Sequence, residues 1–402
     1  MKYSKRISSM QYSPIRKLVP IANKAKANGI KVYHLNIGQP DIKTPKGFFD
    51  AVKSFDNEVL EYAVSQGLPE LITSLQNYYT TYDISFESDE ILITNGGSEA
   101  LLFTIMATCD PKDNILVPEP FYTNYNGFSQ SINVDITPIT TKAEDGFHLP
   151  KKDKIQSLIN SKTKAILLSN PGNPTGTVYT KEELYMIAEI AKENDLWIIA
   201  DEVYREFVYD SLEYTSFGNI KEVEDRVIII DSVSKRYSAC GARIGSIASK
   251  NKALIAQILK LCQGRLCVST LDQIGSTKLY QTPKSYFDEV NKEYKKRRDV
   301  LYNELMKVEG VICKKPRGAF YILAKLPVED AEDFVVWMLT DFNKDGETVM
   351  ACPAEGFYAT PGLGKDEIRL AYILKEEDLY RASILLKEGL ETYLQLKKEN
   401  KI

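Results

Sequence analysis

The sequence is poor in the residues that most often bind metals or serve a serine hydrolase. It has only two histidines, His34 and His148, and its six cysteines are scattered along the chain. The one close pair, Cys262 and Cys267, lacks the spacing of a metal-binding knuckle. These shortages argue against a metal centre and against a Ser-His-Asp mechanism, and the cysteines are interpreted as reduced thiols.

The sequence also lacks a strong charge of either sign and any long apolar run. Its 51 basic and 55 acidic residues give a formal net charge of −4, which leaves no basic footprint for nucleic acid or an anionic membrane. No run of 18 apolar residues occurs, and the basic N-terminus leads into polar sequence rather than the apolar core of a signal peptide. We therefore expect a cytoplasmic protein that binds neither nucleic acid nor membranes.

The 402 residues, 44% of them hydrophobic, are enough for two domains with buried cores. Five short apolar runs predict strands that are covered on both faces, at residues 90–94, 114–118, 164–169, 196–200 and 226–231. Helical patterns lie between several of them, such as the one after the capping box formed by Thr180 and Glu183. This alternation predicts an α/β fold, with a three-layer large domain built on a mainly parallel sheet.

The ends of the chain predict a second, smaller α+β domain. Strands are expected at residues 316–323 and 367–372, and helices at 285–298 and 376–397. We expect a large cofactor-binding domain at 46–283, and a small domain formed by residues 1–45 and 284–402 together.

Polar or glycine-rich segments follow each of the five predicted strands. They are residues 95–100, 118–122, 170–176, 201–204 and 232–235. In open parallel sheets ligands bind beyond the carboxyl ends of the strands, so these five segments are predicted to meet at one crevice.

The last of these segments carries a lysine suited to covalent chemistry. Lys235 follows Ser232 and Ser234 at the end of a buried strand, and Arg243 comes eight residues later. An amine that attacks an aldehyde must first lose its proton, although its ordinary pKa is about 10.4; burial and a neighbouring cation both favour that loss. The two hydroxyls and the guanidinium can bind a phosphate. Taken alone the segment also fits a surface loop, but with the other strand ends it predicts a Schiff base with pyridoxal phosphate.

From about Asn36 to Tyr372 the chain resembles the class I/II aminotransferases, fold-type I pyridoxal-phosphate enzymes, and within them the aspartate-aminotransferase-like branch. The resemblance implies that Lys235 holds the cofactor and is the catalytic base. It further implies that Asp201 contacts the pyridine nitrogen, and that Tyr204 and Asn173 contact the phenolic oxygen. By themselves Asp201 could be a helix cap and Asn173 a turn residue.

The resemblance assigns the remaining cofactor contacts as well. The phosphate would be bound by Ser232, Ser234, Arg243 and the helix start formed by Gly97, Ser98 and Glu99. Tyr122 would stack on the cofactor ring. Tyr62 matches a tyrosine that reaches the phosphate of the neighbouring subunit, which implies a homodimer with shared active sites.

Substrate contacts are implied at the two ends of the chain. Arg369 would bind the α-carboxylate of the amino acid, with Asn173 beside it. Gly38 would bring a backbone amide close to the same carboxylate, and Ile37 could line the side-chain pocket. Arg265 is one candidate for the substrate side chain, but the residues around it depart from the family pattern.

The function that follows is a transaminase that passes an amino group from an amino acid, with L-aspartate favoured, to 2-oxoglutarate by ping-pong transfer. Two alternatives on the same fold stay open: a transaminase for aromatic or aliphatic amino acids, and a carbon–sulfur β-lyase. A non-catalytic cofactor-binding regulator is disfavoured, because the chain has no basic or helix-turn-helix segment.

Overall fold

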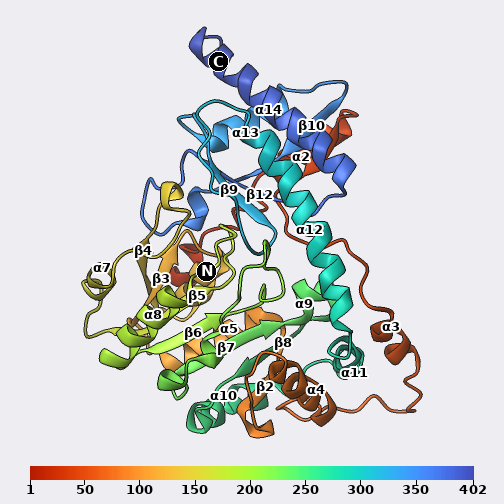
Figure 1. Cartoon of the computed structure of the whole chain (residues 1–402), viewed down its shortest axis with the longest axis vertical. Coiled ribbons are helices and arrows are strands. Elements are labelled where there is room, and N and C mark those ends of the chain that lie inside the picture. The colour runs from red at the N-terminus through yellow and green to blue at the C-terminus, as the bar shows by residue number, and fades with distance from the viewer.

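The computed structural model describes all 402 residues, and a seven-stranded sheet dominates its lower part (Figure 1). The strand order is β2-β8-β7-β6-β5-β3-β4, and every strand except β8 runs in the same direction. The strands are β2 (Ile91–Asn95), β3 (Asn114–Glu119), β4 (Asp135–Thr140), β5 (Thr163–Ser169), β6 (Trp197–Asp201), β7 (Val227–Ser232) and β8 (Ile244–Ala248).

All five predicted strands are present, as β2, β3, β5, β6 and β7, and the mainly parallel sheet is confirmed. Two further strands were not predicted. β4 is an edge strand whose residues are mostly half-exposed and include Pro138, so it lacks the continuous apolar run of a buried strand. β8 contains Gly245 and Ser246 in its middle, which weakens the same signal.

Helices cover both faces of this sheet. The side chains of β7 alternate, so that Ile228 and Ile230 pack toward α5, α6 and α10, whereas Val227 and Ile229 pack toward α4, α8 and α11. These helices are α4 (Pro69–Thr80), α5 (Gly96–Thr108), α6 (Asn124–Ser131), α8 (Lys181–Glu193), α10 (Lys252–Arg265) and α11 (Thr270–Leu279). The predicted three-layer arrangement is therefore present.

The capping box predicted for α8 is also present. The Glu183 backbone amide donates to Thr180 Oγ1 at 3.2 Å, and the Thr180 amide donates to Glu183 Oε2 at 2.7 Å. These bonds satisfy two amides at the helix start that have no partner within the helix.

A second core lies in the upper part of Figure 1, around two small sheets and the helices α2, α12, α13 and α14. A parallel pair joins β1 (Lys31–His34) to β10 (Glu347–Met350), and an antiparallel sheet has the order β11 (Cys352–Pro353), β12 (Glu367–Ala371), β9 (Tyr321–Lys325). The helices are α2 (Val19–Ala27), α12 (Lys284–Leu305), α13 (Ala331–Thr340) and α14 (Glu376–Lys398). The remaining helices are α1 (Lys5–Ser8), α3 (Lys46–Lys53), α7 (Lys152–Gln156) and α9 (Val233–Arg236). Six 3₁₀ segments complete the fold: Ser88–Glu90, Ala143–Asp145, Phe217–Asn219, Lys221–Val223, Cys240–Ala242 and Glu355–Phe357.

The elements predicted near the C-terminus are found with one correction. β12 and α14 lie where they were expected, and α12 extends the predicted helix at both ends. The strand predicted at 316–323 begins only at Tyr321, because the amides of Arg317 and Gly318 donate to the Gly176 carbonyl oxygen instead of a sheet partner. The proposed domain boundaries at 45/46 and 283/284 stay a prediction, which the segregation of the small sheets to residues 31–34 and 321–371 supports.

Candidate active site

A cavity of about 470 Å³ lies at the carboxyl ends of the five predicted strands. Each strand is followed by at least one residue that lines this cavity. Of the residues predicted to bind the cofactor, those that line it are Gly97, Ser98, Tyr122, Asn173, Asp201, Tyr204, Ser232, Ser234, Lys235 and Arg243. The predicted substrate residues Ile37, Gly38 and Arg369 line the same cavity. The volume falls in the usual range for a small-molecule site.

Lys235 lies in the short helix α9, directly after β7. Its Nζ donates to the Gly38 carbonyl oxygen at 2.9 Å, a contact between segments 197 residues apart in the sequence. A Cβ at Gly38 would overlap the ring and hydroxyl of Tyr321, so the close packing of Tyr321 on this backbone requires glycine. The N-terminal segment and α9 therefore meet directly at the lysine amine.

Asp201, the last residue of β6, is buried and has no cation beside it. Tyr125 donates its hydroxyl hydrogen to Asp201 Oδ2 at 2.6 Å, and the Val203 amide approaches Oδ1 at 3.4 Å. Burial raises the pKa of Asp201 to about 6, against the hydrogen bond from Tyr125, which lowers it. A carboxyl in this environment is suited to a cationic N–H partner.

The hydroxyls of Tyr204 and Tyr321 lie 2.9 Å apart at the edge of the cavity. Burial raises the pKa of Tyr204 above its ordinary value, so its hydroxyl stays protonated and can donate a hydrogen bond. Asn173 accepts from Arg369 Nη1 through its Oδ1 at 3.1 Å, which leaves its NH₂ group as a donor. Tyr204 and Asn173 can therefore both donate to an oxygen in the cavity.

Arg243 and the start of α5 form a cradle with no room for side chains. Arg243 adopts a left-handed backbone conformation with φ +55°. A Cβ at Gly96 would overlap its guanidinium, and a Cβ at Gly245 would overlap the backbone between Gly96 and Gly97. The Ser232 and Ser234 hydroxyls lie 2.8 Å apart nearby. Arginine, two hydroxyls and a helix N-terminus together suit a phosphate.

Arg369 comes from the middle of β12 and is 1% exposed. Its Nη2 donates to the Asn36 carbonyl oxygen at 2.6 Å, and its guanidinium lies 4.7 Å from the ring centroid of Tyr321. Its Nε has no hydrogen-bond partner although it is buried. A buried guanidinium with an unused donor is ready to bind a carboxylate.

Three residues considered at the sequence level do not line the cavity. Glu99 accepts from the Asn95 amide at 2.8 Å and lies 3.3 Å from Arg265 Nε. Arg265 also donates to the Ile93 carbonyl oxygen at 3.1 Å, and although its Nη1 is buried without a hydrogen-bond partner, its side chain lies outside the cavity. Tyr62 is 81% exposed at the surface.

Several lining residues were not predicted from the sequence. Asn124, at the start of α6, could have been found, because it lies two residues after Tyr122 and donates to its hydroxyl. Tyr321 and the N-terminal residues Ser13 and Arg16 carry no motif that marks them.

The residues fit pyridoxal phosphate by three separate observations. Asp201 is a buried carboxyl without a cation, Arg369 has a buried donor without a partner, and glycine at position 96 lets the Arg243 guanidinium lie against the start of α5. No group of three or more His, Cys, Asp or Glu side chains is arranged to hold a metal ion. None of the helices combines the length and apolar character needed to cross a membrane.

Comparison with known proteins gives consistent results. Residues 30–382 match the model of a family described as aminotransferase class I and II. A relative named "Probable aspartate aminotransferase" from Methanocaldococcus jannaschii is 32% identical over 396 residues, which cover 96% of this chain and 100% of the relative. An alanine aminotransferase structure from Pyrococcus furiosus is 31% identical with a TM-score of 0.89, covering 97% of this chain and 100% of that chain. A structure of the aspartate aminotransferase from Thermus thermophilus with maleate is 25% identical, with a TM-score of 0.86 and coverage of 97% and 100%. The predicted fold is confirmed by these likenesses.

Proposed function

Because the chain belongs to the class I and II aminotransferases, we propose that it transfers the amino group of L-aspartate to 2-oxoglutarate in two half-reactions. The observation that carries the proposal is the set of groups around one cavity: the Lys235 amine, the buried Asp201 carboxyl and the free Nε of Arg369.

The family implies pyridoxal phosphate as the cofactor, and each part of it has suitable residues in the cavity. When bound, the cofactor supplies a carbonyl carbon that binds amines and a ring that withdraws electrons from the substrate α-carbon. Lys235 would hold it covalently, Asp201 would bind the ring nitrogen, and Tyr204 and Asn173 would donate to its phenolic oxygen.

The remaining cofactor contacts lie around the ring and its phosphate. Arg243, Ser232 and Ser234 would bind the phosphate with the amides at the start of α5, to which Gly97, Ser98 and Glu99 belong. Tyr122 would lie against the ring face.

The protein groups also explain how a substrate is oriented and deprotonated. Arg369 can bind the α-carboxylate through its unused Nε, and the Asn36 carbonyl and Asn173 fix the guanidinium. With the carboxylate held, Lys235 Nζ can take the proton from the α-carbon and return it at a neighbouring atom. The contact with Gly38 keeps that amine at the cavity wall.

Aspartate is favoured as the donor by the relatives. The protein from Methanocaldococcus jannaschii is named for aspartate, and the Thermus thermophilus enzyme was obtained with maleate, a four-carbon dicarboxylate. A test is a panel of amino donors with 2-oxoglutarate as acceptor, measuring the new amino acid and oxo acid. We expect aspartate to give oxaloacetate and glutamate in equal amounts. Ammonia and pyruvate formed without an acceptor would instead identify a carbon–sulfur β-lyase.

Two copies of the chain are proposed to share their active sites. Tyr62 lies in an irregular segment with the exposed apolar residues Val59, Leu60 and Val64, which suits burial against another copy. A mixture of the inactive Lys235→Ala variant with a Tyr62→Ala variant tests this. Hybrid dimers would contain one site with both native residues, so we expect activity above that of either variant alone. No gain after subunit exchange would contradict sharing. The cytoplasmic location expected from the sequence stays a prediction.

A further inference from the structure

A short N-terminal segment separates the active-site cavity from a second cavity. Residues 11–18 are here called the strap. All of them except Ile15 line an outer groove of about 870 Å³, together with Glu332 and residues between Pro353 and Gly362. Ser13 and Arg16 line both this groove and the active-site cavity. The strap is therefore a wall of the active site as well as part of the surface.

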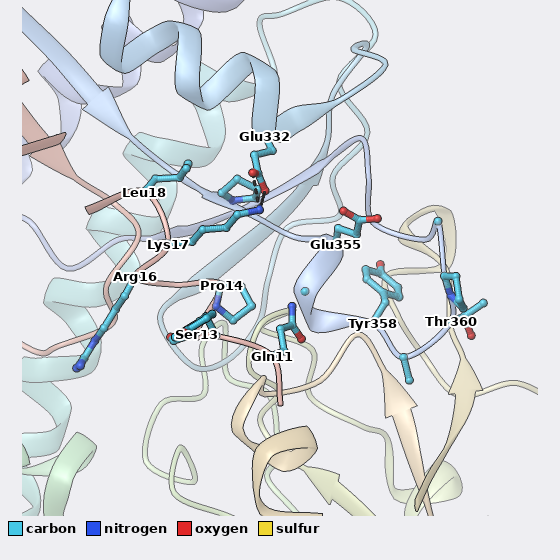
Figure 2. Close-up of a pocket in the computed structure, with 16 residues that line it drawn as sticks. Gln11, Ser13, Pro14, Arg16, Lys17, Leu18, Glu332, Glu355, Tyr358 and Thr360 are labelled. Atoms are coloured by element: carbon cyan, nitrogen blue, oxygen red, sulfur yellow. Dashed lines mark hydrogen bonds and ion pairs between the residues drawn. The ribbon is translucent and has the colours of Figure 1, made fainter. Parts of the chain in front are cut away.

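The strap is fastened along its length. Lys17 Nζ donates to Glu332 Oε2 at 2.8 Å, and Figure 2 shows these two side chains meeting across the groove. The Asn36 side chain donates to the Ile15 carbonyl oxygen at 3.0 Å, and Gly356 packs so closely on Pro14 that a Cβ would overlap it. These contacts hold the strap on both sides of Arg16.

Arg16 itself has no partner. No ion pair or hydrogen bond involves its side chain, in contrast with Lys17 next to it. Figure 2 shows the Arg16 guanidinium pointing away from Glu332 and from the groove residues Gln11 and Tyr358. An unpaired, solvated guanidinium is ordinary on a protein surface, but this one lines a cavity built for anions.

The charge around the cavity is strongly positive. Its lining includes four cationic side chains, Arg16, Lys235, Arg243 and Arg369, and one carboxyl, Asp201. In the proposed function Lys235 binds the carbonyl carbon of the cofactor, Arg243 binds its phosphate, and Arg369 binds the α-carboxylate of the substrate. Arg16 is the one cation left without an anion.

Arg16 also lies at the correct end of the cavity. Arg369 donates to the Asn36 carbonyl, and the side chain of Asn36 donates to the carbonyl of Ile15, the residue before Arg16. This hydrogen-bonded chain connects the α-carboxylate arginine to the strap. Ile37, Arg16 and Arg369 all line this cavity, so we expect the second carboxylate of a substrate held by Arg369 to extend toward Arg16.

We infer that Arg16 binds the side-chain carboxylate of dicarboxylic substrates, so that the strap makes the enzyme selective for them. The inference rests on the proposed transaminase function and goes beyond it by naming the residue that selects the substrate. It also replaces Arg265, which does not line the cavity and forms an ion pair with Glu99.

The test compares two neutralised cations of the N-terminal region, Arg16→Met and Lys24→Met. For each, kcat/KM is measured with aspartate and with alanine. A lost charge-assisted contact should lower the aspartate-to-alanine ratio by about 10- to 100-fold in Arg16→Met. Lys24 is exposed on α2 and lines neither cavity, so its replacement should leave the ratio unchanged. An unchanged ratio in Arg16→Met, or an equal loss in both variants, would overturn the inference.

A binding measurement gives a readout independent of turnover. By calorimetry, succinate should bind wild-type protein more tightly than propionate, and the Arg16→Met variant should bind the two with similar affinity. Retained preference for succinate would contradict the inference.

The outcomes separate the two proposals. If wild-type protein transaminates only monocarboxylic donors, the role of Arg16 is wrong and the transaminase function stands. If no donor reacts with any oxo acid, both proposals are wrong.

Discussion

The two ends of the active-site cavity are built in different ways. The cofactor end is formed by residues at or just beyond the ends of strands of one sheet, such as Asp201 at the end of β6 and Lys235 after β7. The substrate end is assembled from the N-terminal segment with Arg16 and Gly38, from β9 with Tyr321, and from β12 with Arg369. One region depends on a regular scaffold and the other on packing between distant segments.

This difference has a consequence for chemistry and specificity. The sheet brings the residues at the carboxyl ends of its parallel strands together independently of the substrate. The arrangement of the cofactor end therefore does not need to change when the substrate changes. The substrate end is held by a few contacts, among them Asn36 to Ile15 and Lys17 to Glu332, and can change without disturbing the sheet. Substitutions at the two ends should therefore have separable effects.

The largest effect is expected at the cofactor end. Lys235→Ala removes the amine that we propose holds the cofactor and moves the proton, and turnover should fall by at least roughly 10⁴-fold. The absorbance of lysine-bound cofactor should disappear in the same variant. Lys252→Ala, which removes an exposed lysine paired with Asp89, is the matched control and should keep both. Substantial activity in Lys235→Ala would contradict the assignment.

At the substrate end we expect a smaller effect that spares the cofactor. Arg369→Lys keeps the charge but loses the fork of donors, so kcat/KM should fall by about 10²-fold for every amino donor, aspartate and alanine alike. The cofactor absorbance should be unchanged, which distinguishes this variant from Lys235→Ala. Arg381→Lys, a surface arginine paired with Glu347, serves as the control. A changed cofactor spectrum in Arg369→Lys would show that the two ends are not separable.

The smallest effect concerns stability without cofactor. Burial raises the pKa of Asp201 from 3.8 to about 6, so the folded state binds more protons than the unfolded state between these values. Asp201 therefore destabilises the cofactor-free protein increasingly as pH rises through 6. In urea denaturation, cofactor-free Asp201→Asn should be more stable than wild type at pH 8, by about 3 kcal/mol at most, and the gain should shrink toward pH 4.

Added pyridoxal phosphate should reverse this order, because only Asp201 can pair with a cationic ring nitrogen. If Asp201→Asn were destabilising at pH 8 without cofactor, the idea that the buried Asp201 carboxyl lacks a cationic partner would be contradicted.

Much of the fold and of the cofactor end could be predicted from the sequence for the same physical reason. Strands covered on both faces appear as continuous apolar runs, and the residues after Ile228–Ile230 or Ile198–Ala200 are then placed by the sheet itself. Strands β4 and β8 were not predicted because Pro138 and Gly245 interrupt their apolar pattern.

The substrate end was harder because its residues have no regular spacing. Arg369 and Gly38 were predicted only through the family resemblance. The position of Tyr321 depends on where β9 begins, and β9 begins late because the preceding amides donate to the Gly176 carbonyl oxygen. Nothing local to Arg16 distinguishes it from Lys17, and only the packing of the strap separates a residue that lines the active site from one bound to Glu332.

The central claim is that Lys235 carries the cofactor and releases it to an amino donor. Borohydride reduction followed by peptide mass spectrometry tests this directly, because it fixes the cofactor to the lysine that holds it. The label should be found on Lys235, disappear after prior incubation with aspartate, and return after 2-oxoglutarate is added. A label on another lysine, or one that no amino donor removes, would contradict the account.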